Sequence, residues 1–311
     1  MKIVALAGGV GGAKLADGLS RALPPGDLTV VVNIGDDFEH WGLKICPDLD
    51  TVCYTLAGLA NPETGWGRAD ETWNAFAAMQ ALGAADWFRV GDKDLGTHVE
   101  RTRRLRAGEL LSRVTQAFCQ AWAVGASVLP ATDDSVPTLV DTAQLGELAF
   151  QEYFVHLRCE PEVTGFRFAG VDRARPAPGV VESIANADAI VICPSNPWVS
   201  IDPILAVPGL RAAMRGKTVV AVSPIIAGQT VKGPAAKMFS ELGIEPSALS
   251  VAEHYLGLVT AFVQDVRDAD LAPSIDALGV RTLALDTLMK TPADRERLAR
   301  DVLHFVERQI T

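Results

Sequence analysis

The sequence lacks the features that mark secreted, zinc-binding and membrane proteins. Its five cysteines are odd in number and scattered without any CxxC spacing, so neither a disulfide framework nor a cysteine zinc site is predicted. No apolar stretch approaches the roughly 20 residues of a membrane-spanning helix. The opening residues carry one lysine before a short apolar run, which is typical of a core strand and not of a signal peptide. We therefore expect a cytoplasmic protein with reduced thiols and no attachment to a membrane.

Basic residues are also few relative to acidic ones. The 311 residues include 28 Lys and Arg against 38 Asp and Glu, which gives a formal net charge of −10. Broad nucleic-acid binding depends on neutralising phosphates with Lys and Arg, so the balance argues against it. An acidic protein that binds phosphate needs a bridging cation, and Mg²⁺ is the usual one. The length fits one large α/β unit or two modest domains.

Glycine, by contrast, is concentrated in the first turn of the chain, residues 7–14, which read Ala-Gly-Gly-Val-Gly-Gly-Ala-Lys. An apolar strand pattern precedes this turn and a helical pattern of leucines follows it. Glycines there allow positive φ and close approach of a ligand, and the free N–H groups of the helix attract anions. One glycine would suffice for a turn that binds nothing, so four favour a phosphate or nucleotide site.

This turn does not fit two familiar nucleotide-binding templates. A dinucleotide fingerprint requires glycine at position 14 and an acid at the end of the second strand, where the chain has Lys14 and Asn33. A P-loop requires Ser or Thr after the lysine, and the chain has Leu15. Neither an NAD-dependent oxidoreductase nor a P-loop ATPase is therefore predicted.

Acidic residues follow the second predicted strand in two groups. Asp36 and Asp37 come directly after the strand that ends at Asn33, and Asp48 and Asp50 begin the next helical segment. Ligands of open α/β sheets bind at the carboxyl ends of strands, which is where the first pair lies. The residues alone allow two interpretations: a solvated acidic surface in which Asp48 is an N-cap, or a divalent-cation site beside the glycine turn.

The pattern of strands and helices predicts an α/β fold with a Rossmann-like, doubly wound and mostly parallel sheet. Residues 1–60 and 181–311 are expected to form its nucleotide- and phosphate-binding core. Residues 61–180 lose the regular alternation and are predicted to be an inserted, largely helical second lobe that covers the acceptor site. Within it, Gly91–His98 is expected to be a ligand-facing loop and Phe150–Leu157 an extended segment.

Two later loops are expected at the same edge of the sheet. Ser195 and Asn196 lie between two prolines after a predicted buried strand, and Ser223 follows the next strand. Lys232 precedes a predicted helix that begins at Pro234, which provides a second candidate contact for phosphate or nucleotide.

In this order the motifs resemble the family of 2-phospho-L-lactate transferase and its bacterial phosphoenolpyruvyl counterpart. The resemblance covers essentially the whole length and rests on residues 8–14, 33–37, 46–51 and 91–98, and on 194–197 with 223–225. It implies transfer of a phospho-three-carbon acid from a guanosine-diphosphate-activated donor to 7,8-didemethyl-8-hydroxy-5-deazariboflavin, with release of GMP, in the biosynthesis of coenzyme F-420. Phosphoryl transfer of this kind needs positioning and charge stabilisation and no redox step.

The resemblance also implies residue roles. Asp37 and Asp50 are expected to bind Mg²⁺, with Asp36 and Asp48 as alternative ligands, and Asp50, Lys93 and Asp37 are expected to be catalytic. Asp50 would orient or deprotonate the attacking ribityl hydroxyl, and Lys93 would contact the deazaflavin or the transferred phosphate. The residues expected to bind substrates are Gly9, Gly11, Gly12, Lys14, Asn33, Asp50, Lys93, His98, Ser195, Asn196 and Ser223.

A sister family with a similar glycine turn provides the alternative interpretation: a non-catalytic regulator that binds nucleotide-sugars. The segments 46–50 and 91–94 favour the transferase, because a binding protein has no need of a metal-ligand cluster. The expected partners are small molecules, with a homodimer as the default assembly. Lactate, enolpyruvate and glycerate remain as alternative donor acids.

Overall fold

The structure, a computed structural model, describes residues 1–310. Its main sheet has seven strands among these residues, in the order β14-β13-β10-β9-β1-β2-β5, and every pairing is parallel. The strands are β1 (Ile3–Ala7), β2 (Leu28–Val32), β5 (Ser127–Pro130), β9 (Ala189–Ile192), β10 (Thr218–Val222), β13 (Ala261–Asp265) and β14 (Arg281–Leu285). All residues of β1, β9 and β13 are buried. Such continuous burial is expected of a parallel sheet covered on both faces.

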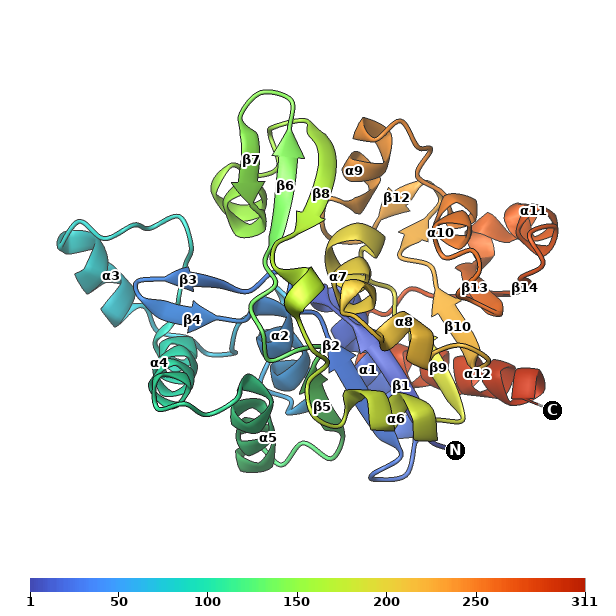
Figure 1. Cartoon of the computed structure of the whole chain (residues 1–311), viewed down its shortest axis with the longest axis horizontal. Helices are drawn as coiled ribbons and strands as arrows, with labels where there is room; N and C mark the ends of the chain where they lie inside the picture. Colours follow the sequence, from blue (N-terminus) through green and yellow to red (C-terminus); the bar gives the residue numbers. More distant parts are fainter. Residues whose placement is uncertain (311) are drawn as a thin grey trace.

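Helices cover both faces of this sheet (Figure 1). The crossovers from β1 to β2 and from β9 to β10 run in opposite directions along the sheet, so right-handed connections place their helices on opposite faces. On one side, α1 (Gly9–Ala22) packs against α2 (Pro47–Leu56) and α12 (Pro292–Ile310). The connection from β9 to β10 contains the π-helical turn η3 (Pro197–Ile201), α7 (Asp202–Ala206) and α8 (Leu210–Ala213), and α8 also contacts α6 (Val180–Asn186).

The remaining elements surround the main sheet. The helices are α3 (Asn74–Ala81), α4 (Asp92–Arg106), α5 (Leu111–Ala121), α9 (Ala235–Glu241), α10 (Ala248–His254) and α11 (Ala272–Asp276), with 3-10 turns η2 (Val171–Arg173) and η4 (Val266–Leu271). Small antiparallel pairings join β3 (Phe38–His40) to β4 (Leu43–Ile45), β6 (Thr138–Thr142) to β7 (Gly146–Ala149) and β8 (Val163–Phe168), and β11 (Ile225–Ile226) to β12 (Gln229–Thr230). Figure 1 shows β6, β7 and β8 at one end of the molecule and the β3–β4 hairpin with α3 at one side.

The predicted fold class, a Rossmann-like doubly wound sheet, is confirmed. The sheet also includes β5, which lies inside the segment 61–180 and pairs with β2. The boundaries predicted for an inserted lobe therefore do not coincide with the boundaries of the sheet, and the division into domains stays a prediction.

Two local predictions are wrong. The segment expected to be extended contains the π-helical turn η1 (Glu152–His156), where the rings of Phe150 and Phe154 stack with centroids 5.4 Å apart. A strand does not bring side chains four residues apart into contact, whereas a helical turn does. The string expected as a loop after Gly91 is the start of α4, whose first turn carries Asp92 and Asp94. Acidic residues there favour the helix because they meet the positive end of its dipole.

The helices within residues 1–310 include none with the length and apolar character needed to cross a membrane.

Candidate functional site

The glycine turn lies at the topological switch point of the sheet. β1 and β9 are neighbours, and the chain leaves them toward opposite edges of the sheet, which opens a crevice beyond their carboxyl ends. The loops that follow the two strands are joined by the side chain of Ser195. The Gly8 N–H donates to Ser195 Oγ (3.2 Å), and the same hydroxyl donates to the Gly8 carbonyl (2.8 Å). The sequence-predicted residues of both loops are therefore brought together.

Two glycines of this turn are required by the packing of the loops. A Cβ on Gly11 would lie 2.3 Å from the Pro194 carbonyl oxygen, and one on Gly12 would lie 2.5 Å from Ser195 Oγ. Gly9 has a different role, since its φ is +63° and nothing lies within 4 Å of its Cβ position. Only Gly9 among these three therefore has open space in front of it, where a ligand can approach the backbone.

Replacing Gly11 with alanine is expected to lower the free energy of unfolding by roughly 1–3 kcal/mol, because the methyl group must push the β1 and β9 loops apart. Gly96→Ala is the control: Gly96 is an exposed residue of α4 with no atom within 4 Å of its Cβ position. That change should stabilise the helix by up to about 1 kcal/mol. Denaturant unfolding measures both, and a Gly11→Ala protein as stable as the wild type would contradict the close packing.

A cavity of about 730 Å³ opens beside the turn. The predicted site residues that line it are Gly9, Gly11, Lys14, Asp36, Asp48, Asp50, His98, Ser195, Asn196 and Ser223. Gly12, Asn33, Asp37 and Lys93 were also predicted and do not line it. Most of the predicted set is thus gathered around one cavity.

Asp36 and Asp48 form a buried pair of carboxylates held by one amide. Asn33 Nδ2 lies 2.8 Å from Asp36 Oδ1 and 2.9 Å from Asp48 Oδ2. The Gly9 N–H donates to Asp48 Oδ1 (2.8 Å), which links the pair to the glycine turn. Gln151 Nε2 lies 3.3 Å from Asp36 Oδ2. Asn33 therefore lies behind the cavity wall and orients two residues of the wall.

Charge is left unbalanced at this pair. Burial, and then the neighbouring charge of Asp48, raise the pKa of Asp36 well above its usual value, and burial raises the pKa of Asp48 to about 6. Within residues 1–310, the hydrogen-bond donors to both carboxylates are neutral amides. Buried carboxylates without a positive partner are costly, and oxygen ligands suit a hard divalent cation. The donor set of Asp36 and Asp48 therefore fits Mg²⁺.

Asp37 is differently placed from Asp36. Its Oδ2 lies 3.1 Å from Lys44 Nζ and accepts a hydrogen bond from the Cys46 thiol (3.1 Å). Lys44 thus already balances the charge of Asp37, which is not among the residues that line the cavity. The role of Asp37 as a metal ligand therefore stays a prediction, and adjacent residues of the loop that follows β2 have different surroundings.

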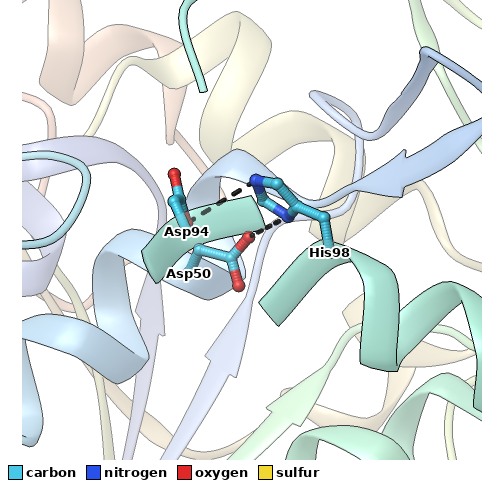
Figure 2. A group of neighbouring side chains, drawn as sticks. All are labelled: Asp50, Asp94 and His98. Atoms are coloured by element: carbon cyan, nitrogen blue, oxygen red, sulfur yellow. Dashed lines mark ion pairs between the residues drawn. The ribbon is translucent and has the colours of Figure 1, made fainter. Parts of the chain in front are cut away.

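A second cluster joins α2 to α4 (Figure 2). Asp50, Asp94 and His98 each offer a ligand atom within 4.8 Å of the others. The His98 ring lies between the carboxylates, with Nδ1 3.7 Å from Asp50 Oδ2 and Nε2 3.5 Å from Asp94 Oδ1. The Tyr54 hydroxyl donates to Asp94 Oδ1 (2.7 Å). Burial opposes ionisation of Asp94, but the hydrogen bond and charge of His98 hold the pKa of Asp94 below its usual value.

Arg101 supplies a positive charge that neutralises Asp50 in this second cluster. The guanidinium is 3% exposed, and its two terminal nitrogens bind the two oxygens of Asp50. NH1 also lies 3.3 Å from His98 Nδ1. Since Arg101 already neutralises Asp50, the Asp36–Asp48 pair is the better cation site of the two.

Lys93 is not brought to the cavity. It is exposed, and its ammonium donates to the carbonyl of Ala69 (3.0 Å). Asp94, the next residue of α4, faces the cavity, and successive residues of a helix point about 100° apart. A contact between Lys93 and a substrate therefore stays a prediction, whereas Asp94 of the same motif lines the cavity.

Aromatic side chains line another part of the same cavity. Trp87, Phe88, Phe150 and Phe154 all lie in its wall. Trp87 and Phe88 meet edge to face with centroids 5.9 Å apart. The sequence did not indicate these residues, because Trp87 and Phe88 lie in a loop and Phe150 and Phe154 in a helical segment about 60 residues later. Their ring surfaces suit a flat, conjugated ligand.

The glycine turn, the buried carboxylates and the aromatic wall meet at one cavity of an α/β protein, beyond the carboxyl ends of its strands. Comparison with known proteins makes this more specific. The sequence profile of the family described as 2-phospho-L-lactate transferase CofD matches residues 3–304, and the chain belongs to this family of transferases.

Similar proteins agree with this assignment. A phosphoenolpyruvate transferase of Streptomyces griseus is 45% identical over 314 residues, which cover 99% of each chain. Another phosphoenolpyruvate transferase, from Thermobifida fusca, is 45% identical and 94% of each chain is covered. Among solved structures, a member of the UPF0052 family from Bacillus halodurans superposes with a TM-score of 0.63 at 16% identity, covering 97% of this chain and 98% of the other. That likeness supports the fold.

Proposed function

We propose that this chain transfers a phospho-three-carbon-acid group, 2-phospholactyl or phosphoenolpyruvyl, from a GDP-activated donor to 7,8-didemethyl-8-hydroxy-5-deazariboflavin in coenzyme F-420 biosynthesis. The ribityl hydroxyl attacks the phosphorus that bears the acid, a new P–O bond forms, and the bond to GMP breaks. The observation that carries the proposal is one continuous cavity that joins a glycine turn and buried carboxylates to an aromatic wall. Such a cavity accommodates a nucleotide diphosphate and a flat acceptor together.

The glycine turn is proposed to hold the diphosphate of the donor. Gly9 leaves open space in front of the backbone, and α1 begins there with the positive end of its dipole. Lys14 lines the cavity and donates one hydrogen bond, to the Met289 carbonyl (2.8 Å). An ammonium has three N–H groups, so further donors of Lys14 remain for phosphate oxygens.

Asp36 and Asp48 are proposed to hold Mg²⁺, with Asn33 orienting both carboxylates. When bound, Mg²⁺ would neutralise the diphosphate and the charge that develops on departing GMP. Asp50 is proposed to orient the ribityl hydroxyl and accept its proton, since Arg101 fixes the carboxylate at the cavity wall. His98 holds Asp94 on the other side of the same wall.

The test is a mass-spectrometric assay with purified protein, the deazariboflavin acceptor, Mg²⁺ and each guanosine-diphospho three-carbon acid in turn. We expect a phosphodiester product and GMP, both absent with EDTA. The enolpyruvyl donor should react fastest, since relatives at 45% identity are named phosphoenolpyruvate transferases. If no donor gave product while the protein bound a nucleotide-sugar, the proposed transferase activity would be wrong and the alternative, a regulatory protein that binds nucleotide-sugars, would be supported.

Cytoplasmic location and a homodimeric state stay predictions. Sedimentation velocity on the purified protein tests the second of them, and a single species with the mass of one chain would contradict it.

A further inference from the structure

Two loops from distant parts of the sequence meet above the glycine turn. The first, residues 61–68, follows α2, and the second, residues 229–234, leads from β12 to α9. Both loops line the cavity, the first through Thr64, Trp66 and Gly67 and the second through Thr230, Val231, Lys232, Gly233 and Pro234. Any substrate held at the glycine turn therefore lies next to both loops.

The first loop rests directly on the glycine turn. Gly65 has a φ of +79°, and a Cβ there would lie 2.7 Å from Val10 Cγ1 and 3.4 Å from Lys232 Nζ. Glycine at position 65 thus permits both the backbone conformation and the close contact. The loop is pressed between Val10 of the turn and Lys232 of the second loop.

One side chain fastens the second loop to the first. Lys232 Nζ donates to the Thr64 carbonyl (2.5 Å) and lies 3.5 Å from the Glu63 carbonyl. These partners are neutral, and no carboxylate in residues 1–310 forms an ion pair with Lys232 or with Lys14. Two ammonium groups without an anionic partner therefore lie in the wall of one cavity.

The charges of these ammonium groups affect each other. Burial, then the charges of Arg295 and Lys232, lower the pKa of Lys14, and the weaker opposing effect comes from the charge of Asp294. Like charges near one another destabilise the arrangement that holds them together, and an anion between them removes that repulsion. The positive end of the α1 dipole also attracts an anion to this part of the cavity.

We propose that Lys232 is a donor-positioning residue that couples closure of the loops 61–68 and 229–234 to binding of the donor's diphosphate. The inference rests on the proposed function for the identity of the donor. Lys232 keeps its hydrogen bond to Thr64 and gives a remaining N–H to a phosphate oxygen, so one ammonium joins the ligand and both loops. Because the diphosphate relieves the repulsion between Lys232 and Lys14, it stabilises the closed loops relative to open ones.

The experiment compares the wild type with Lys232→Met, which removes the charge and keeps the length, and with Lys232→Arg, which keeps the charge. Lys217→Met is the matched control, since Lys217 also binds backbone carbonyls, those of Ala185 and Ala187, and lies outside this cavity. Calorimetry measures binding of GDP and of inorganic pyrophosphate. Hydrogen exchange measures protection of the amides in residues 61–68 with and without GDP.

Loss of a charge-assisted hydrogen bond is worth roughly 10- to 100-fold in affinity. We expect Lys232→Met to bind GDP and pyrophosphate that much more weakly and to lose the GDP-dependent protection of residues 61–68. Lys232→Arg should restore both properties, and Lys217→Met should match the wild type.

Wild-type affinity in Lys232→Met, or loop protection that does not respond to GDP, would overturn the inference. If the wild type binds GDP with loop protection and forms no phosphodiester with any donor, the proposed reaction fails and the role of Lys232 stands.

Discussion

Asp36→Asn is expected to slow metal-dependent transfer roughly a thousandfold, because a divalent cation contributes several kcal/mol of charge stabilisation at such a site. The same change removes one of two buried carboxylates that share Asn33 and have no cationic partner among the described residues. Stability without metal should therefore be unchanged or higher. The rate is measured by product formation against Mg²⁺ concentration, and stability by denaturant unfolding with EDTA.

Asp17→Asn is the control, because it is expected to lower stability and to leave the metal-dependent rate unchanged. Asp17 is buried in α1, binds Arg21 (3.0 Å) and Arg295 (3.1 Å), and is not among the residues that line the cavity. Its loss should lower the free energy of unfolding by about 1–3 kcal/mol and leave the metal dependence of the rate unchanged. An Asp36→Asn protein with the wild-type rate and wild-type Mg²⁺ dependence would show that the cation binds elsewhere.

Arg101→Met is expected to have the largest effect on stability, a loss of about 3–5 kcal/mol, because it leaves the buried carboxylate of Asp50 without its cation. Arg101 also contacts His98, and one connection between α2 and α4, the Arg101–Asp50 pair, is lost with it, whereas the hydrogen bond from Tyr54 to Asp94 remains. Denaturant unfolding measures the loss. A double variant, Arg101→Met with Asp50→Asn, should be less destabilised than the single variant, because no uncompensated charge remains.

The matched control is Arg103→Met on the exposed face of the same helix. Arg103 pairs with Glu100 (2.7 Å), but its side chain is 65% exposed. Exposed pairs contribute about 0–1 kcal/mol, so this variant should be close to the wild type. Equal stability of the Arg101 and Arg103 variants would contradict the burial of the Asp50–Arg101 pair.

The fold followed from sequence because its signals are local. The apolar runs that became β1, β2, β9 and β10 are continuous, as strands buried on both faces must be. The glycine turn also has a local cause, and its position beyond β1 was predicted from residues 8–12. What periodicity did not reveal is that β5 extends the main sheet, because strand pairing depends on contacts far apart in sequence.

The site was harder to predict, for a related reason. A motif identifies a segment, whereas the direction of each side chain depends on the helix or loop that holds it. Asp36 and Asp94 face the cavity, whereas their neighbours Asp37 and Lys93 do not. Arg101 was assigned no role from the sequence, yet it is buried against Asp50 and His98. Its position three residues after His98, on one face of a helix, is the signal that would have identified it.

The adjacency of β1 and β9 has a consequence for biosynthesis. β1 is apolar along its whole length and pairs with β9 from Ile3 opposite Ala189. A ribosome adds about 5–20 residues each second, so β1 emerges on the order of ten seconds or more before its partner strand. During that interval β2 can pair with one side of β1, and the other side is an exposed apolar strand edge, the kind of surface on which nascent chains aggregate. The ligand site and this interval of exposure to aggregation thus have the same cause: β1 lies in the middle of the sheet, and its second neighbour, β9, is synthesised late.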